Sequence, residues 1–147
     1  MKCEIVKPLK DSMTPQSHEP SLRKQAVRGD SAPMGLPFSP GIKLGDFVFI
    51  SGQGPIDKNG KIVQGDIRAQ TRLTLENFKR VAEAAGSSMG DVVQTTVYLK
   101  NLDDYAVMNE VYASFFPGPR PARATVQAGL LFGMLVEVQG IAYISDK

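Results

Sequence analysis

The sequence is poor in the residues that build metal sites and nucleophilic sites. Its 147 residues include one cysteine, Cys3, one histidine, His18, and no tryptophan. A lone cysteine excludes an intrachain disulfide and fits a reducing compartment, so we expect a cytoplasmic protein. One cysteine and one histidine, both in the polar N-terminal region, disfavour a Cys/His zinc site, and the sequence predicts no bound metal. The same shortage disfavours a Ser-His-Asp triad or a Cys-His pair.

Long apolar runs and a large net charge are also missing. No apolar run reaches the length of a membrane span, and the first residues lack the apolar stretch of a signal peptide, so we expect no membrane partner. The formal net charge at pH 7 is only +2. Basic residues outnumber acidic ones within residues 1–33, and the remainder of the chain is neutral. A neutral core disfavours nucleic acid as a partner.

A chain of 147 residues predicts one domain that is large enough for a real core. Residues 1–22 mix proline, serine, lysine and histidine without periodicity, which predicts a partly disordered N-terminal extension. A solvated arm is the favoured interpretation of its charge, and a docking arm is the alternative. Residues 23–147 form the predicted domain.

Turn signals predict strands at the beginning of this domain. A short strand is expected near residues 24–27, and residues 42–51 predict a hairpin that turns at Gly45-Asp46. Residues 47–50 are apolar on both faces, which predicts a strand that is covered on both sides.

Two helical patterns follow. Asp66 is expected to cap the first helix and Gly86 to end it. A strand over residues 91–100 leads to a second helix, with Asp103 as its expected cap and Pro117 as its stop. The expected buried stripes are Ile67, Thr71, Thr74, Leu75, Phe78, Val81, Ala82 and Ala85 in the first helix, and Tyr105, Met108, Tyr112 and Phe115 in the second.

The order of strands, helix, strand, helix, strand and strand predicts an α+β fold with a mixed β-sheet and two helices packed on one face. In the strand over residues 91–100, Val93, Val97 and Leu99 are expected to share one face. A monomer does not leave a large apolar sheet face wet, so we expect the uncovered face to pack against other copies of the chain. The apolar residues expected on that face include Tyr98, Leu135, Ile141 and Tyr143.

The last two predicted strands, residues 121–127 and 134–139, carry the strongest chemical signal. Their short connection predicts an antiparallel hairpin. If the register centres on the middle of that connection, Thr125 lies opposite Glu137 and Arg123 is a diagonal neighbour of the carboxylate. A cation and a carboxylate would then share one sheet face among apolar residues, where charged groups need partners or a function.

Each candidate residue has a functional and a structural interpretation. Arg123 could bind a planar carboxylate through two hydrogen bonds, or form a salt bridge with Glu137 or a neighbouring subunit. Glu137 could hold a water and carry a proton, or serve only as the partner of the arginine. Asn109, inside the second helix, is either a binding contact or a solvated amide. The glycine-rich residues 51–54 follow a predicted strand but lack the Lys-Ser/Thr of a phosphate loop, so we interpret them as a turn at the end of that strand.

Several short blocks follow one another in a specific order. They are Gly45-Asp46, Phe49-Ile50-Ser51-Gly52-Gln53, Glu83-Ala84-Ala85-Gly86, Thr95-Thr96-Val97-Tyr98-Leu99, Leu102-Asp103-Asp104-Tyr105, Asn109, Tyr112, Phe115-Phe116 and Pro121-Ala122-Arg123. Each block is weak alone, but together they resemble the RidA/YjgF (Rid) family of enamine/imine deaminases. The similarity runs from about residue 24 to residue 144.

The resemblance implies a chorismate-mutase-like subunit, a homotrimer around a central β-barrel, and three clefts between subunits. It implies hydrolysis of 2-aminoacrylate or 2-iminopropanoate, and of related 2-imino acids, to the 2-oxo acid and ammonia without a cofactor. In this scheme Arg123 binds the substrate carboxylate and Glu137 positions the attacking water. Further substrate contacts are expected from Asn109, Thr125, Phe38 and Ser51.

The chain departs from the family pattern in four ways. Phe38 stands where many members have tyrosine, and Thr125 stands where many have cysteine. The spacing from Arg123 to Glu137 is about one residue shorter than usual, and the N-terminal extension is longer. Phe38 and Leu131 are expected to shape the pocket. The alternatives are a non-catalytic trimer that binds small carboxylates or acts like a chaperone, and a protein that acts on RNA, which the neutral core disfavours.

Overall fold

The computed structural model describes residues 22–28 and 35–146 of the chain. The expected N-terminal extension, residues 1–22, lies outside the described residues except for Leu22. The boundary between extension and domain therefore stays a prediction.

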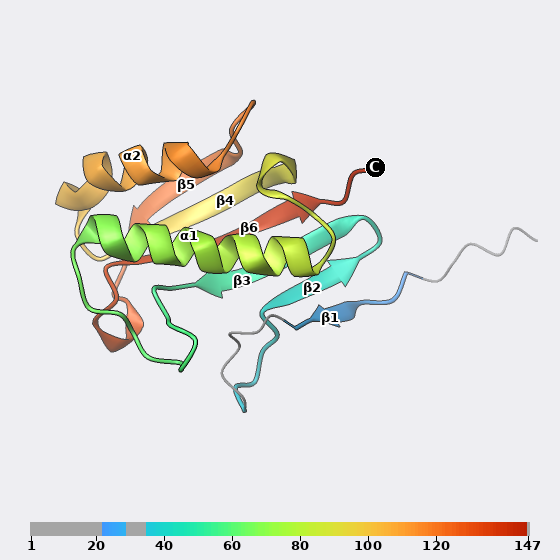
Figure 1. Ribbon diagram of the computed structural model, residues 1–147, viewed down its shortest axis with the longest axis horizontal. Coiled ribbons are helices and arrows are strands. Elements are labelled where there is room, and N and C mark those ends of the chain that lie inside the picture. The colour runs from blue at the N-terminus through green and yellow to red at the C-terminus, as the bar shows by residue number, and fades with distance from the viewer. Residues whose placement is uncertain (1–21, 29–34, 147) are drawn as a thin grey trace, which may run out of the picture.

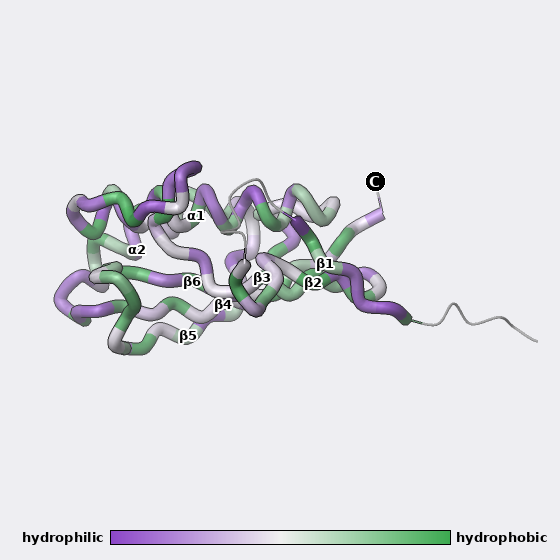
Figure 2. Tube along the Cα trace, turned by 90° about the horizontal axis from the view of Figure 1, so that it is seen from below, coloured by the Kyte–Doolittle hydropathy of each residue, from purple (hydrophilic) through white to green (hydrophobic). Residues whose placement is uncertain are grey.

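Within the described residues, the chain forms one mixed sheet with two α-helices on one face (Figure 1). The strand order across the sheet is β1-β2-β3-β6-β4-β5. Seen edge-on, both helices lie on the same side of the sheet, and the other side is left open (Figure 2). The predicted fold class is confirmed. The elements are β1 (Gln25–Val27), β2 (Gly41–Leu44), β3 (Phe47–Gln53), α1 (Ile67–Ala84), β4 (Val92–Leu99), α2 (Tyr105–Phe115), β5 (Ala122–Gln127) and β6 (Val136–Tyr143), with short 3-10 helices at Met89–Asp91, Leu102–Asp104 and Leu131–Gly133.

One of the two predicted hairpins is confirmed and the other is wrong. β2 and β3 pair antiparallel around a turn in which Gly45 has φ +58°, a conformation that glycine adopts without strain. The last two strands do not pair with each other. β4 lies between them, parallel to β5 and antiparallel to β6.

The path of the chain explains this order. α2 carries the chain back along the sheet, and a crossover of this kind makes β5 parallel to β4. The connection from β5 to β6 then passes the end of β4. There Ala128 N–H donates to the Leu99 carbonyl at 3.0 Å, and Lys100 N–H donates to the Leu135 carbonyl at 3.0 Å.

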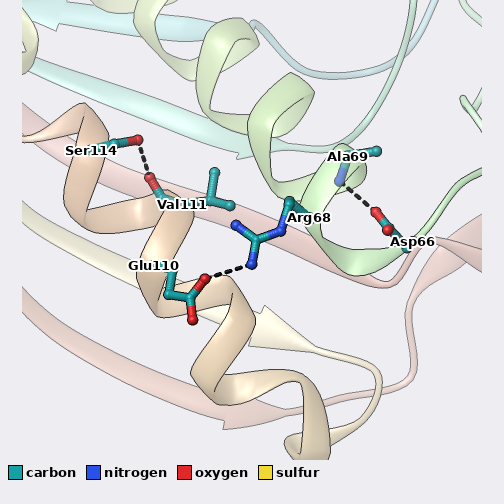
Figure 3. A network of polar contacts seen from close by, with 6 residues as sticks. All are labelled: Asp66, Arg68, Ala69, Glu110, Val111 and Ser114. Atoms are coloured by element: carbon teal, nitrogen blue, oxygen red, sulfur yellow. Dashed lines mark hydrogen bonds and ion pairs between the residues drawn. The ribbon is translucent and has the colours of Figure 1, made fainter.

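α1 forms as the sequence predicts. The Asp66 carboxylate caps it by accepting a hydrogen bond from Ala69 N–H at 2.8 Å (Figure 3). The predicted stripe faces the sheet and is buried, with only Ala85 at its end half-buried. On its outer side, Arg68 pairs with Glu110 of α2, and this ion pair joins the two helices (Figure 3).

Two buried amides of α1, absent from the predicted stripe, hold loops on the sheet side of the helix. Gln70 Oε1 accepts a hydrogen bond from Leu135 N–H at 2.8 Å. Asn77 Nδ2 donates to the carbonyls of Gly54 and Ile56 at 2.9 and 2.8 Å. Buried polar groups need such partners, and here they fix the segments that follow β3 and precede β6.

α2 begins differently from the prediction. Asp103 does not cap it, because a 3-10 turn precedes the helix and the side chain of Asn101 caps that turn by accepting from Asp103 N–H at 2.9 Å. In the predicted stripe, Met108 and Tyr112 are buried, but Tyr105 is 46% exposed.

Two strand positions also face the opposite way from the prediction. Val93 is 47% exposed while Val92 is buried, because the β4–β6 register shifts between Val92 and Gln94. Leu135, in the strand predicted over residues 134–139, precedes β6 and packs against the core rather than on the open face, and its N–H donates to Gln70 of α1.

The open sheet face carries several exposed apolar side chains. Phe47 and Tyr143 meet edge to face, with ring centroids 5.7 Å apart, and Phe49 and Val126 lie exposed on the same side. The strand over residues 47–50 is thus covered on one side only within a single chain. Its predicted cover by further copies stays a prediction.

The buried stripe of α1 predicts a measurable contrast between two leucines. Leu75 is 0% exposed and Leu22 is 73% exposed. We expect Leu75→Ala to lower the free energy of unfolding by roughly 2–5 kcal/mol, and Leu22→Ala to change it by less than about 0.5 kcal/mol. Urea unfolding at one fixed protein concentration measures both, and equal effects would contradict the assigned core.

Candidate functional site

Two cavities contain most of the predicted site residues. The first, here the arginine cavity, has a volume of about 470 Å³ and is lined by Leu102, Tyr105, Arg123 and Thr125. The second, here the glutamate cavity, has a volume of about 500 Å³. It lies where the β3–β6 ladder is interrupted, and its lining includes Phe38, Ser51, Gly52, Leu131, Phe132 and Glu137.

The register of β4 decides on which face each charge lies. Val97 is fully buried toward the helices and pairs with Thr125 on one side and with Val138 on the other. Directly paired residues share a sheet face, and side chains alternate along a strand. Arg123, two residues before Thr125, therefore faces the helix layer. Glu137, next to Val138, faces the open side.

The expectation that Arg123 and Glu137 share one face is therefore wrong, and so is the expected pairing of Thr125 with Glu137. Glu137 pairs with Tyr98 of β4 instead. The error follows from the predicted hairpin, because the insertion of β4 changes the neighbour of each strand.

Arg123 rests on aromatic rings rather than on a carboxylate. Its Cζ lies 4.6 Å from the ring centroid of Tyr112 and 5.7 Å from that of Tyr105. Its Nη2 donates to the Tyr105 hydroxyl at 3.4 Å. Among the described residues the ion pairs join Arg68 to Glu110 and Lys79 to Glu83, so Arg123 is not bridged to Glu137 within one chain. The guanidinium is held in place while its charge stays uncompensated there.

Polar atoms near Arg123 also lack partners. In the described part of the chain, Thr125 Oγ1 and Asn109 Oδ1 are buried without a hydrogen bond. Asn109 lies one helical turn after Tyr105, and its amide, followed by the Arg123 guanidinium, lowers the pKa of the Tyr105 hydroxyl. The Thr125 hydroxyl can donate a hydrogen bond, and a cation with an unpartnered donor beside it is suited to bind a small anion. Tyr105, predicted only as a core residue, belongs to this group.

Glu137 is half-buried at the sheet's open side. Burial raises the pKa of its carboxyl above the ordinary 4.5. The carboxylate lies over Gly52 so closely that a Cβ there would be 1.9 Å from Oε1. A side chain at position 52 would therefore force the Glu137 carboxylate to move. A carboxylate with a raised pKa, on a cavity wall, can hold a water and accept a proton from it.

The remaining predicted residues shape the glutamate cavity. Ser51 Oγ donates to the Ser39 carbonyl at 2.6 Å, and Ser51 N–H donates to the Pro40 carbonyl at 2.9 Å. These bonds tie the segment that carries Phe38 to the end of β3, and the Phe38 ring is 58% exposed at the cavity. Residues 51–53 still belong to β3, so the strand runs further than the sequence predicts and the expected turn at its end does not begin at Ser51.

No group of three or more His, Cys, Asp and Glu side chains that could hold a metal ion is present within residues 22–28 and 35–146. In the same part of the chain, no helix is both long enough and apolar enough to cross a bilayer.

Comparisons with known proteins agree with this architecture. Residues 30–144 match the sequence model of a family described as Endoribonuclease L-PSP. A RutC family protein of Pyrococcus horikoshii is 50% identical over 123 residues, which cover 82% of this chain and 98% of that protein. The mitochondrial protein mmf2 of Schizosaccharomyces pombe is 39% identical over 125 residues, which cover 82% of this chain and 98% of mmf2.

Solved structures show the same likeness. RidA from the Antarctic bacterium Psychrobacter matches with a TM-score of 0.76 and 41% identity, covering 82% of this chain and 99% of that one. E. coli TdcF with bound serine matches with a TM-score of 0.76 and 37% identity, covering 82% of this chain and 99% of that one. With matches of this identity over more than two thirds of its length, the chain belongs to the RidA/YjgF (Rid) family.

Proposed function

We propose that this chain is a cofactor-independent hydrolase that converts reactive 2-imino and enamine acids to 2-oxo acids and ammonia. The observation that carries the proposal is Arg123, a guanidinium seated on two tyrosine rings with no carboxylate partner among the described residues. The buried, unpartnered Thr125 Oγ1 lies on the same strand. This arrangement suits the planar carboxylate that every 2-imino acid carries.

The site requires two copies of the chain. Arg123 lies on β5, an edge strand, and faces the helix layer, whereas Glu137 faces the open side of the sheet. One copy cannot bring them to the same small molecule. When a second copy packs its apolar open face beside the β5 edge, its Glu137 can approach the Arg123 of the first. We propose a homotrimer with three such sites, in which Asn109, Thr125, Phe38 and Ser51 also border the substrate.

The chemistry needs only positioning and a proton carrier. Arg123 holds the carboxylate through two parallel hydrogen bonds and so orients the C=N carbon. Glu137 of the neighbouring copy accepts a proton from water as the water oxygen bonds to that carbon. It then returns this proton to nitrogen, which gives a carbinolamine. In the second step the carboxylate takes the proton of the new hydroxyl group and passes it to the amine nitrogen as the C=O bond forms and the C–N bond breaks, so ammonia leaves and the 2-oxo acid remains. Free imines already hydrolyse in water, so a modest acceleration suffices.

The relatives support this substrate class over the alternatives. TdcF was solved with bound serine, a small molecule that carries an amino acid carboxylate. The family description names an endoribonuclease, but a formal net charge of +2 over 147 residues gives little attraction for RNA phosphates. A non-catalytic carboxylate-binding trimer is the second candidate, because the arginine cavity would serve it equally well. The name of mmf2 includes a mitochondrial location, so the cytoplasmic expectation stays a prediction.

Replacing Arg123 tests the proposal directly. We expect Arg123→Ala to lower kcat/KM for 2-iminopropanoate by at least about 100-fold, because two charge-assisted hydrogen bonds are lost. The imine is generated in place by an amino acid oxidase, and semicarbazide trapping reports how fast it disappears. Arg68→Ala, in a surface ion pair away from both cavities, is the matched control and should keep the wild-type rate. Equal rates for wild type and Arg123→Ala would refute the hydrolase.

The raised pKa of Glu137 predicts the pH dependence. Only the ionised carboxylate can accept a proton from water, so kcat/KM should fall as the pH drops through a value above the ordinary 4.5. Glu137→Gln should lose most of the rate and this acid limb, whereas Glu110→Gln, on the outer helix surface, should keep both. An acid limb that survives in Glu137→Gln would assign the base to another group.

The same pKa predicts an effect of opposite sign on stability. Because burial raises the folded-state pKa above the unfolded value, the contribution of Glu137 to stability is greatest at low pH and is lost as the pH rises through the folded pKa. Glu137→Gln, neutral throughout, should therefore unfold at an equal or higher urea concentration than wild type near about pH 7, with the difference shrinking toward about pH 4. A glutamine variant that is less stable at both values would contradict the assigned burial.

A further inference from the structure

The glutamate cavity presents one ionisable group within walls that are mainly apolar. Leu36, Phe38, Ile56 and Met134 line it together with Leu131 and Phe132. The neutral polar side chains in its lining are already bonded within the chain. Ser51 Oγ donates to the Ser39 carbonyl at 2.6 Å, Gln53 Nε2 to the Ser51 carbonyl at 3.1 Å, and Gln139 Nε2 to the Tyr98 hydroxyl at 3.0 Å.

Glu137 is thus the one ionisable side chain in this lining that can meet the polar part of a ligand. Its carboxylate repels a second carboxylate, so an acidic ligand side chain is excluded from this cavity. The molecule that fits has one polar centre beside Glu137 and an apolar tail.

Leu131 and Phe132 present large side chains at this cavity at a cost in backbone strain. They are 68% and 78% exposed within one chain. Phe132 has φ 56° and ψ 24°, and among the described residues it alone has a positive φ without being glycine. Gly133, with φ 74°, continues the turn, and Met134 N–H closes it by donating to the Leu131 carbonyl at 3.1 Å. A bulky residue in the left-handed region is strained, and such strain is typical of functional sites.

We propose that Leu131 and Phe132 select the substrate's side chain, and that the preferred substrates are 2-imino acids with branched aliphatic or aromatic side chains. This inference rests on the proposed function. Carbon 2 of a 2-imino acid bears a carboxylate, the nitrogen and one side chain. With the carboxylate at Arg123 and carbon 2 beside Glu137, the side chain points to the apolar remainder of the glutamate cavity. A cavity of about 500 Å³ is far larger than a methyl group requires.

The rates on imines of different amino acids provide the test. We expect kcat/KM to be at least about tenfold higher for the leucine- or phenylalanine-derived imine than for the alanine-derived one. The glutamate-derived imine should react more slowly than the alanine-derived one because Glu137 repels its side chain. A wild-type preference for the alanine-derived imine would overturn the proposal.

Two variants and one control test whether Leu131 and Phe132 cause the preference for larger side chains. Phe132→Gly keeps the turn, because glycine adopts positive φ without strain, and Leu131→Ala shortens the second side chain. Each should bring the leucine-to-alanine ratio close to one by raising KM for the larger imine. Leu22→Ala, equally exposed but outside both cavities, is the matched control. An unchanged ratio in both cavity variants would overturn the assignment, and so would a change in ratio that accompanies loss of the wild-type assembly mass.

Calorimetry separates this inference from the proposed hydrolase. Pyruvate and 4-methyl-2-oxopentanoate are stable 2-oxo acids that differ only in their side chains. We expect the branched acid to bind about tenfold more tightly to wild type and equally with pyruvate to Phe132→Gly. If wild type consumes no imine faster than Arg123→Ala does, the proposed hydrolase activity is refuted. The ratio of the two binding affinities then still shows whether the apolar subsite exists. Equal affinities in wild type would refute the subsite even if imines are hydrolysed.

Discussion

The ladder that β4 forms with its two neighbours determines on which face of the sheet Arg123 and Glu137 lie. Val97 is buried toward the helices and pairs with both Thr125 and Val138, which fixes the faces of β5 and β6 together. A shift of one residue in either pairing would exchange the faces. Because the register holds, Arg123 faces the helix layer and Glu137 faces the open side. The two charges stay apart in one chain, so the proposed chemistry, which combines them, requires a second copy.

The two half-sites are built by different means. The arginine half uses aromatic rings: Tyr112 is buried beneath the guanidinium and Tyr105 lies at its side, so the cation is oriented without being neutralised. The glutamate half depends on a glycine, which has no side chain, and on a buried amide side chain. Gly52 leaves room for the Glu137 carboxylate, and Asn77 of α1 holds the loop after β3. Core packing thus supports both halves, although neither contains a metal-binding cluster within the described residues.

Local signals in the sequence predicted the local structure. The pairing of the last strands and the strained backbone at Phe132 became visible only in the structure. Asp66 caps α1 as its position indicated, because an N-cap is a contact within one turn. Alternation of apolar and polar residues shows which side chains of a strand share a face, but it does not show which strands lie beside it. The sequence therefore did not indicate that β4 lies between β5 and β6. Val93 faces outward because the β4–β6 register shifts between Val92 and Gln94, and no residue type there indicates such a bulge. Tyr105 has the helical spacing of a core residue, yet it lies beside Arg123. No residue type near Phe132 indicated that its backbone would adopt the left-handed conformation.

Mixing two inactive variants tests most directly whether the site is shared between copies. Arg123→Ala retains the glutamate and Glu137→Gln retains the arginine. If the chains are unfolded together and refolded at equal concentrations, random assembly makes about one interface in four that pairs the intact arginine of one copy with the intact glutamate of another. A site shared between copies should give this mixture about a quarter of the wild-type rate on 2-iminopropanoate. A mixture no more active than either variant alone, at the same assembly mass, would contradict it.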